Sequence, residues 1–207
     1  MARGRVRLIA AVGILAVVGA GVAVTVVLLS RSDPLSVVRG WSEARNAGDV
    51  DRAMSYVADE GNILGIGVHL PGERDRLRSI FEAQALASWS VEDSDCVVAV
   101  SANDPAEAEV TCRYVQRDRA LDRWGVTLVG THEYVVRNGL IVRALRTHDA
   151  DSQRSAYAVF DAFRAWVRDT HPELFDVIWV DRTSAIYTTP DGARAVLDLL
   201  DDYQPPR

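Results

Sequence analysis

The sequence has 207 residues, 48% of them apolar, which is enough for one domain of ordinary size with a real core, plus a tail. Its formal net charge of −6 argues against a nucleic-acid-binding surface. The two cysteines lack the close-spaced pairs typical of zinc ligands, and Gly65 and Gly67 lack the third glycine of a dinucleotide loop. We therefore expect no metal and no cofactor.

The first 31 residues have the pattern of a cytoplasmic stub and a membrane anchor. Arg3, Arg5 and Arg7 precede an uncharged run over 8–29, and a helix of that length rises about 33 Å, enough to cross a bilayer core of about 30 Å. A cleaved signal peptide is the alternative, although its apolar core usually has only about 7–15 residues. The positive-inside rule keeps the N-terminus in the cytoplasm and places residues 34–207 outside it.

Three helices are expected in the first part of the exported domain. Pro34 suits the first position of a helix that ends before Asn46, and Asp49 caps a short second helix that ends near Asp59-Glu60-Gly61. Residues 62–70 are expected to form a short strand or loop. Apolar residues at helical spacing predict the third helix over 73–87.

A long β-hairpin is predicted over residues 91–116. The turn signal Asn-Asp-Pro at 103–105 separates an apolar run from a segment in which apolar and polar side chains alternate. Folding about Asp104 pairs Cys96 with Cys112 and Ser94 with Tyr114. Outside the cytoplasm such cysteines can persist as a disulfide, and two buried free thiols are the alternative.

A second hairpin follows a charged connection at 116–125. Residues 126–136 and 140–147 are predicted strands, and Asn138-Gly139 between them is typical of a type I′ turn. His148 ends the second strand, which places it at the rim of the sheet.

The C-terminal part, 150–207, is predicted to be a helical extension. Residues 152–170 form a strongly amphipathic helix, 174–180 form an apolar segment, and Thr189 with Pro190 begins a last helix. Because no linker rich in Pro, Gly or Ser precedes it, we expect this extension to pack on the same domain.

An ordered set of short motifs resembles the NTF2-like superfamily, specifically its SnoaL-like branch. The first motif is Trp41 followed by Asn-Ala-Gly-Asp-Val-Asp-x-Ala-Met at 46–54. The second is a helix that begins at Gly72-Glu73, and the third is Arg-Asn-Gly-Leu-Ile at 137–141, which closes the second hairpin. The resemblance covers residues 34–149. It implies an α+β fold, the NTF2-like cone, in which a curved and mainly antiparallel sheet wraps around helices with a pocket between them.

Members of that family include ketosteroid isomerases, polyketide cyclases, epoxide hydrolases, dehydratases and many domains with no known activity. No catalytic motif of the family matches this sequence residue by residue. His132 and Tyr134 share a face with apolar residues, so they could serve as base and donor inside the cone, or His132 could be a hydrogen-bonded core residue. Asp95 is expected to point outward.

Five aromatic residues could line an apolar pocket, and the alternative is that they fill the core, as aromatics at helical and strand spacing usually do. These residues are Trp41, Tyr56, Trp89, Tyr114 and Trp124.

The leading hypothesis is a non-enzymatic module, anchored in the cell membrane by a single span. Its extracytoplasmic cone would bind an apolar small molecule or a partner protein. The alternative is an enzyme similar to ketosteroid isomerases that uses His132 and Tyr134 in the cone pocket. A third hypothesis is an accessory of an envelope protein complex, and a homodimer is also compatible with the sequence.

Overall fold

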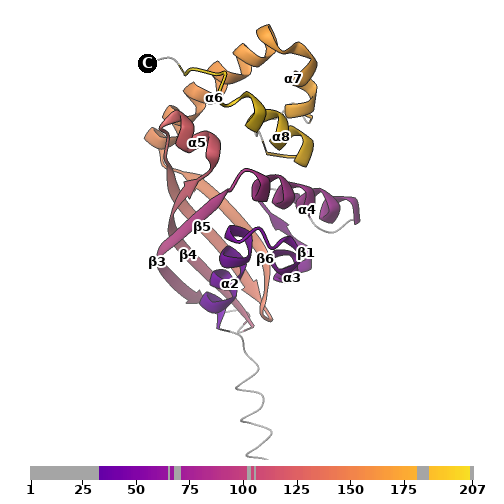
Figure 1. The fold of residues 1–207 in the computed structure, drawn as a ribbon. Coiled ribbons are helices and arrows are strands. Elements are labelled where there is room, and N and C mark those ends of the chain that lie inside the picture. The colour runs from indigo at the N-terminus through magenta and orange to yellow at the C-terminus, as the bar shows by residue number, and fades with distance from the viewer. Residues whose placement is uncertain are drawn as a thin grey trace, which may run out of the picture. The chain divides into compact units, whose positions relative to one another are not determined.

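A curved six-stranded sheet forms one layer of the fold, and helices fill its concave side (Figure 1). The computed structural model describes residues 33–205 other than 65, 68–70, 102–103, 105 and 181–186. Residues 34–207 form one compact unit. The anchor expected at 8–29 lies outside the described residues, and no helix within them is long and apolar enough to span a membrane.

The sheet is mixed, with the strand order β2-β1-β6-β5-β4-β3. Strand β1 pairs with β6 in parallel and every other neighbouring pair is antiparallel. This arrangement agrees with the predicted α+β class and is consistent with an NTF2-like cone. The strands are β1 (Val57–Ile63), β2 (Ile66–Gly67), β3 (Ser90–Val100), β4 (Glu107–Arg117), β5 (Leu128–Arg137) and β6 (Leu140–His148).

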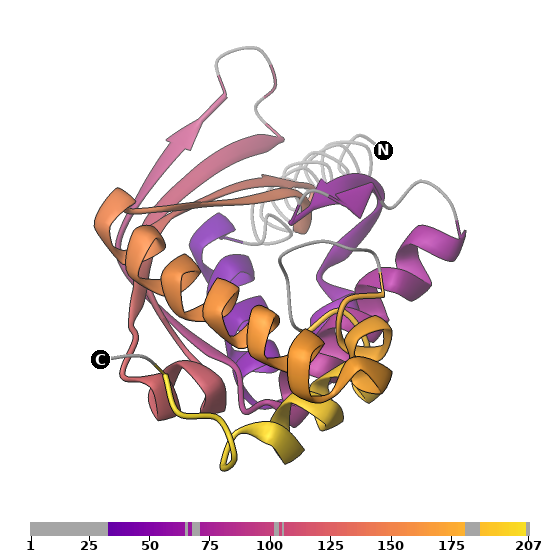
Figure 2. The ribbon, with the colours of Figure 1, turned by 90° about the horizontal axis from the view of Figure 1, so that it is seen from above.

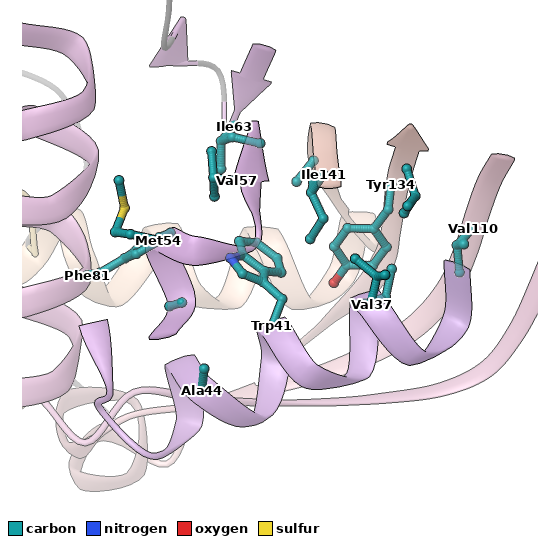
Figure 3. Packing of buried hydrophobic residues seen from close by; sticks show 14 of the residues in the cluster. Val37, Trp41, Ala44, Met54, Val57, Ile63, Phe81, Val110, Tyr134 and Ile141 are labelled. Atoms are coloured by element: carbon teal, nitrogen blue, oxygen red, sulfur yellow. The ribbon is translucent and has the colours of Figure 1, made fainter. Parts of the chain in front are cut away.

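The three predicted N-terminal helices form, and each buries one face against the sheet or its neighbours. The second helix ends at Ser55, earlier than predicted, because Val57 begins a strand that pairs with Ile141. In α2 the apolar residues recur at helical spacing, so Val37, Trp41 and Ala44 lie on one buried face. Figure 3 shows Trp41 between Tyr134 of β5 and Phe81, and both rings meet it edge-on at centroid distances of 5.7 and 6.1 Å. The helices are α2 (Pro34–Asn46), α3 (Val50–Ser55) and α4 (Pro71–Leu86).

The β3–β4 hairpin confirms the predicted disulfide but not the whole predicted register. Cys96 and Cys112 are joined, and Val98 lies opposite Val110. Between Ser94 and Val97 the register shifts through a β-bulge, where Asp95 has a φ of 49°.

The bulge changes which side chains reach the inside of the sheet. The predicted pairing of Ser94 with Tyr114 is wrong, because the residue opposite Tyr114 is Asp93. An extra residue in a strand reverses the side-chain alternation on one side of it. Asp93 consequently turns to the concave face, where its side chain is 8% exposed, whereas Asp95 is exposed.

A short helix, α5 (Arg119–Trp124), replaces the connection expected at 116–125. Asp118 caps it by accepting hydrogen bonds from the backbone N–H groups of Ala120 and Leu121. Gly125 ends it with a φ of 68°, a conformation that favours glycine.

The C-terminal extension builds a second apolar core with α4 and α5. Trp124 of α5 packs against Phe163 of α6, and Tyr203 packs on both rings. In Figure 2, α6 crosses in front of α2, and Figure 1 shows α8 between α7 and α4, in contact with both. The helices are α6 (Ala150–Thr170), α7 (Pro172–Ile178) and α8 (Pro190–Leu199).

Candidate functional site

A cavity of about 270 Å³ lies between the sheet and the C-terminal extension. The ends of β4 and β6, the start of β5, α4, α6 and the segment before α8 all contribute to its wall. Its apolar wall consists of Leu64, Ile80, Trp89, Leu128 and Phe160, and its polar wall consists of Gln84, Gln116, Asp118, Arg146, His148, Tyr157, Tyr187 and Thr188.

A chain of hydrogen bonds runs through the polar wall. Arg146 donates to Oε1 of Gln116, whose amide nitrogen lies 3.4 Å from Asp118 Oδ2. Asp118 Oδ1 accepts from Tyr187 at 3.3 Å, in addition to the two backbone N–H groups of α5. Burial raises the pKa of Asp118 more than these hydrogen bonds lower it.

Arg146 is a partly buried cation that has no carboxylate partner among the described residues. No Asp or Glu oxygen in the described part of the chain lies within 4.0 Å of its guanidinium nitrogens, and Gln116 separates it from Asp118. Burial lowers the pKa of Arg146. The cavity wall therefore carries a guanidinium that no described carboxylate contacts directly.

A second buried cation, Arg45, orients Gln84. Its guanidinium carbon lies 4.0 Å from the ring centroid of Trp89, and it also contacts Trp41 and Phe81. Burial lowers its pKa to about 9. Arg45 donates to Oε1 of Gln84 at 2.8 Å, so the amide nitrogen of Gln84 remains available as a donor at the cavity wall.

Tyr114 lies between the cavity and a buried histidine. Its hydroxyl is hydrogen-bonded to Nδ1 of His148, and its ring stacks on His132 at a centroid distance of 4.2 Å. Burial raises the pKa of Tyr114 to about 12 and lowers the pKa of His148 to about 4. The protonated phenol donates to Nδ1, which leaves His148 neutral with its proton on Nε2.

Behind Tyr114, four polar side chains meet in the core of the cone. Asp93 Oδ1 lies 2.8 Å from His132 Nδ1, and Asp93 Oδ2 accepts from Ser42 at 2.8 Å and from Tyr134 at 3.0 Å. The Tyr134 hydroxyl is also 2.8 Å from His132 Nδ1. His132 is 2% exposed and Tyr134 is 1% exposed. These residues are the Asp93 cluster.

The charge states within the Asp93 cluster follow from burial and hydrogen bonding. Burial raises the pKa of Asp93, but its hydrogen bonds with His132, Ser42 and Tyr134 outweigh burial and hold that pKa below the ordinary value. Burial lowers the pKa of His132 more than Asp93 raises it. A neutral His132 that donates from Nδ1 to an ionised Asp93 keeps a free lone pair on Nε2, which is the arrangement of a general base.

Access to the Asp93 cluster comes from the other side of α2. A groove of about 260 Å³ between α2 and β3 is bordered by Ser42, Asn46 and Asp93. His132 borders neither this groove nor the cavity under the C-terminal helices. His132 and Tyr134 are hydrogen-bonded to each other, but they lie in a packed part of the cone.

Of the five candidate aromatics, Trp89 lines the cavity. Trp41 and Tyr114 are fully buried in the cone, Tyr56 packs at the edge of its core, and Trp124 lies in the second core. Sequence reasoning overlooked the long polar residues of the wall and the acid of the buried cluster, which are Gln84, Gln116, Asp118, Arg146 and Asp93.

Comparison with solved structures finds proteins of the expected kind, at low identity. A candidate polyketide cyclase from Pseudomonas putida is 17% identical, with a TM-score of 0.40 over 56% of this chain and 92% of that chain. An NTF2-like protein of unknown function from Cytophaga hutchinsonii is 14% identical, with a TM-score of 0.40 over 57% of this chain and 91% of that one.

A third similar structure is the orange carotenoid protein of Anabaena bound to canthaxanthin. It is 13% identical, with a TM-score of 0.46 over 56% of this chain and 37% of that chain. No protein-family model matches the sequence, and no curated protein does.

Proposed function

We propose that residues 34–207 bind one small, mainly apolar molecule in the cavity under the C-terminal helices. The observation that carries the proposal is the wall of that cavity, in which five apolar and eight polar side chains converge. Apolar side chains with convergent polar groups are typical of small-molecule sites, whose volumes run from about 300 to 1,000 Å³. At about 270 Å³ the cavity lies just below that range and suits a small ligand.

The binding domain is held outside the cytoplasm by the anchor expected at 8–29. The disulfide between Cys96 and Cys112 supports this part of the proposal, because disulfides persist in oxidising compartments and are rare in the cytosol. Protease added to intact cells should digest residues 34–207 and leave a cytoplasmic marker untouched. Complete protection of this domain in intact cells, with digestion after lysis, would contradict the location.

Thermal unfolding tests the binding proposal. A panel of small aromatic and short-chain apolar compounds is added to residues 34–207. A ligand present at about 100 times its Kd adds about 2.7 kcal/mol to the free energy of unfolding. For a chain of this size each kcal/mol raises the melting temperature by about 2–4 °C. The variant Leu128→Trp, which fills the cavity, should remove the shift. A shift that Leu128→Trp leaves intact would place binding elsewhere.

The alternative function is an isomerase or cyclase in which His132 removes a proton. The contact between His132 and Asp93 favours it, since the carboxylate orients the ring and leaves Nε2 as the base. Binding is preferred because His132 is 2% exposed and borders neither the cavity nor the groove.

An isomerisation assay separates the two functions. With a 3-keto-Δ5 steroid as substrate, the binding proposal predicts no turnover above the uncatalysed rate. Turnover by the wild-type protein that His132→Gln abolishes, while the melting temperature is retained, would establish the enzyme instead. The variant His171→Gln is a suitable control, since His171 lies on the surface between α6 and α7.

A further inference from the structure

Three of the described residues in the polar wall of the cavity, Gln84, His148 and Arg146, offer hydrogen-bond donors. Gln84 offers its amide nitrogen, because Arg45 occupies its oxygen, and neutral His148 carries its remaining proton on Nε2. Thr188 Oγ1 is buried and has no hydrogen-bond partner within the described part of the chain. Arg146 adds a positive charge. A ligand that pairs with this wall must supply acceptors.

The one carboxylate among the described lining residues is already saturated. Asp118 accepts from the backbone of Ala120 and Leu121, from Gln116 and from Tyr187. Those four donors hold it in the wall at the start of α5, away from Arg146. Asp118 therefore does not supply the missing counter-ion, and it does not offer a free site for a cationic ligand.

Arg146 stands where the cavity opens to the surface. A surface hollow of about 450 Å³ shares Leu64, Arg146, His148 and Tyr157 with the cavity. A partly buried guanidinium without a carboxylate is costly, and an oxyanion that accepts two of its N–H groups would compensate the lost hydration. The apolar side chains Ile80, Leu128 and Phe160 line the cavity itself.

We propose that the bound molecule is an organic acid, with its carboxylate on Arg146 at the mouth of the cavity and an apolar body against Leu128 and Phe160. This inference rests on the proposed function and specifies its ligand class. A cavity of about 270 Å³ limits the body to about the size of an aryl group with a short chain. Gln84, His148 and Thr188 supply neutral donors to the same wall.

A matched pair of probes tests the inference by isothermal titration calorimetry. The full chain in lipid nanodiscs is titrated with 4-phenylbutanoate and with 4-phenylbutanamide, and empty nanodiscs give the background for each compound. The two compounds have the same apolar body, so the ratio of their affinities isolates the charge. We expect the acid to bind about tenfold or more tightly, since hydrogen bonds to charged groups are the strong ones.

Two arginine variants on the same strand assign the charge. In Arg146→Gln the acid-to-amide ratio should fall to within about twofold, whereas Arg143→Gln should keep the wild-type ratio. Arg143 is the matched control because it lies three residues earlier on β6 and pairs with Glu109 on the exposed face of the sheet.

The outcomes separate the inference from the proposed function. Equal affinity of the wild type for acid and amide, or a preference that Arg146→Gln retains, overturns the organic-acid inference and leaves the binding function standing. The wild-type comparison decides the matter even if Arg146→Gln does not fold. Binding of both compounds that Leu128→Trp fails to weaken overturns the cavity as the site and the inference with it, as does failure of both compounds to bind.

Discussion

Replacing Asp93 with Asn perturbs a buried carboxylate that three side chains of the cone hydrogen-bond. In the wild type this side chain accepts from Ser42, His132 and Tyr134, and it joins α2, β3 and β5 through them. Asn has nearly the same shape but only one acceptor oxygen. Its NH2 group takes the place of the other oxygen and cannot accept from the donors around it. The substitution therefore removes charge and acceptors without leaving a cavity.

The cost follows from the contacts that are lost. A hydrogen bond to a charged group contributes about 1.5–3 kcal/mol, and at least one of the three contacts survives on the Asn oxygen. Losing the other two gives about 3–6 kcal/mol, and breaking a buried charged pair typically costs about 3–5 kcal/mol. We expect Asp93→Asn to lower the free energy of unfolding by about 3–4 kcal/mol, a large part of the stability of an ordinary domain.

Urea unfolding of residues 34–207, followed by tryptophan fluorescence, measures this loss. Asp95→Asn is the matched control, because Asp95 is exposed at the bulge and Asn tolerates its positive φ. We expect Asp95→Asn to change stability by no more than about 0.5 kcal/mol. A loss below about 1 kcal/mol for Asp93→Asn would refute the reasoning that the Asp93 cluster holds α2 on the sheet.

Three further perturbations test other parts of the account. Gly130→Ala should destabilise the domain by more than about 3 kcal/mol in the same assay, because a Cβ there would lie 2.0 Å from the carbonyl oxygen of Thr147. Wild-type stability of this variant would contradict the close packing at Gly130. Reducing the Cys96–Cys112 disulfide, which closes a loop with a sequence separation of 16, should cost about 3 kcal/mol, and an unchanged melting temperature on reduction would count against it. Burial lowers the pKa of His148 from 6.5 to about 4, so the unfolded chain takes up the proton first, and stability present above pH 6.5 is lost as the pH falls towards 4. His148→Gln should flatten this part of the pH–stability curve, and an unchanged slope would be inconsistent with a buried neutral ring.

Much of the architecture could be predicted because the pattern of apolar residues matches the elements that form. Alternation in β4 placed Cys112 on the inner face, and symmetry about the turn brought Cys96 to it. The same reasoning placed His132 and Tyr134 on the concave face, where both lie. Periodicity succeeds where a strand is regular and one face is buried.

The acid of the cluster was missed because a bulge interrupts that regularity. Asp95 adopts a positive φ, which is uncommon for any residue other than glycine, and no propensity predicts where it occurs. Without the bulge Asp93 would face the wrong way. Helix α5 left a clearer signal, since Asp118 and Gly125 are a typical cap at each end, and the many charges between them obscured it.

The polar wall of the cavity could be predicted only in part. Gln116 continues the inward-facing series of Cys112 and Tyr114, so its position follows from alternation alone. The cavity exists because the C-terminal helices close over the sheet. The contacts between these helices and the sheet join residues that are distant in sequence, so local patterns do not predict them. Arg146 becomes a site residue because Tyr157 and Phe160 of α6 line the same cavity.

Methyl-resolved NMR of residues 34–207 during titration with 4-phenylbutanoate tests the central claim most directly, because the described unit offers methyl groups in both hollows. The account predicts saturable shifts for Leu64, Ile80 and Leu128, which line the cavity, and none for Leu35 and Val38, which border the groove beside Asp93. Shifts confined to Leu35 and Val38, or no shift at any methyl group, would contradict it.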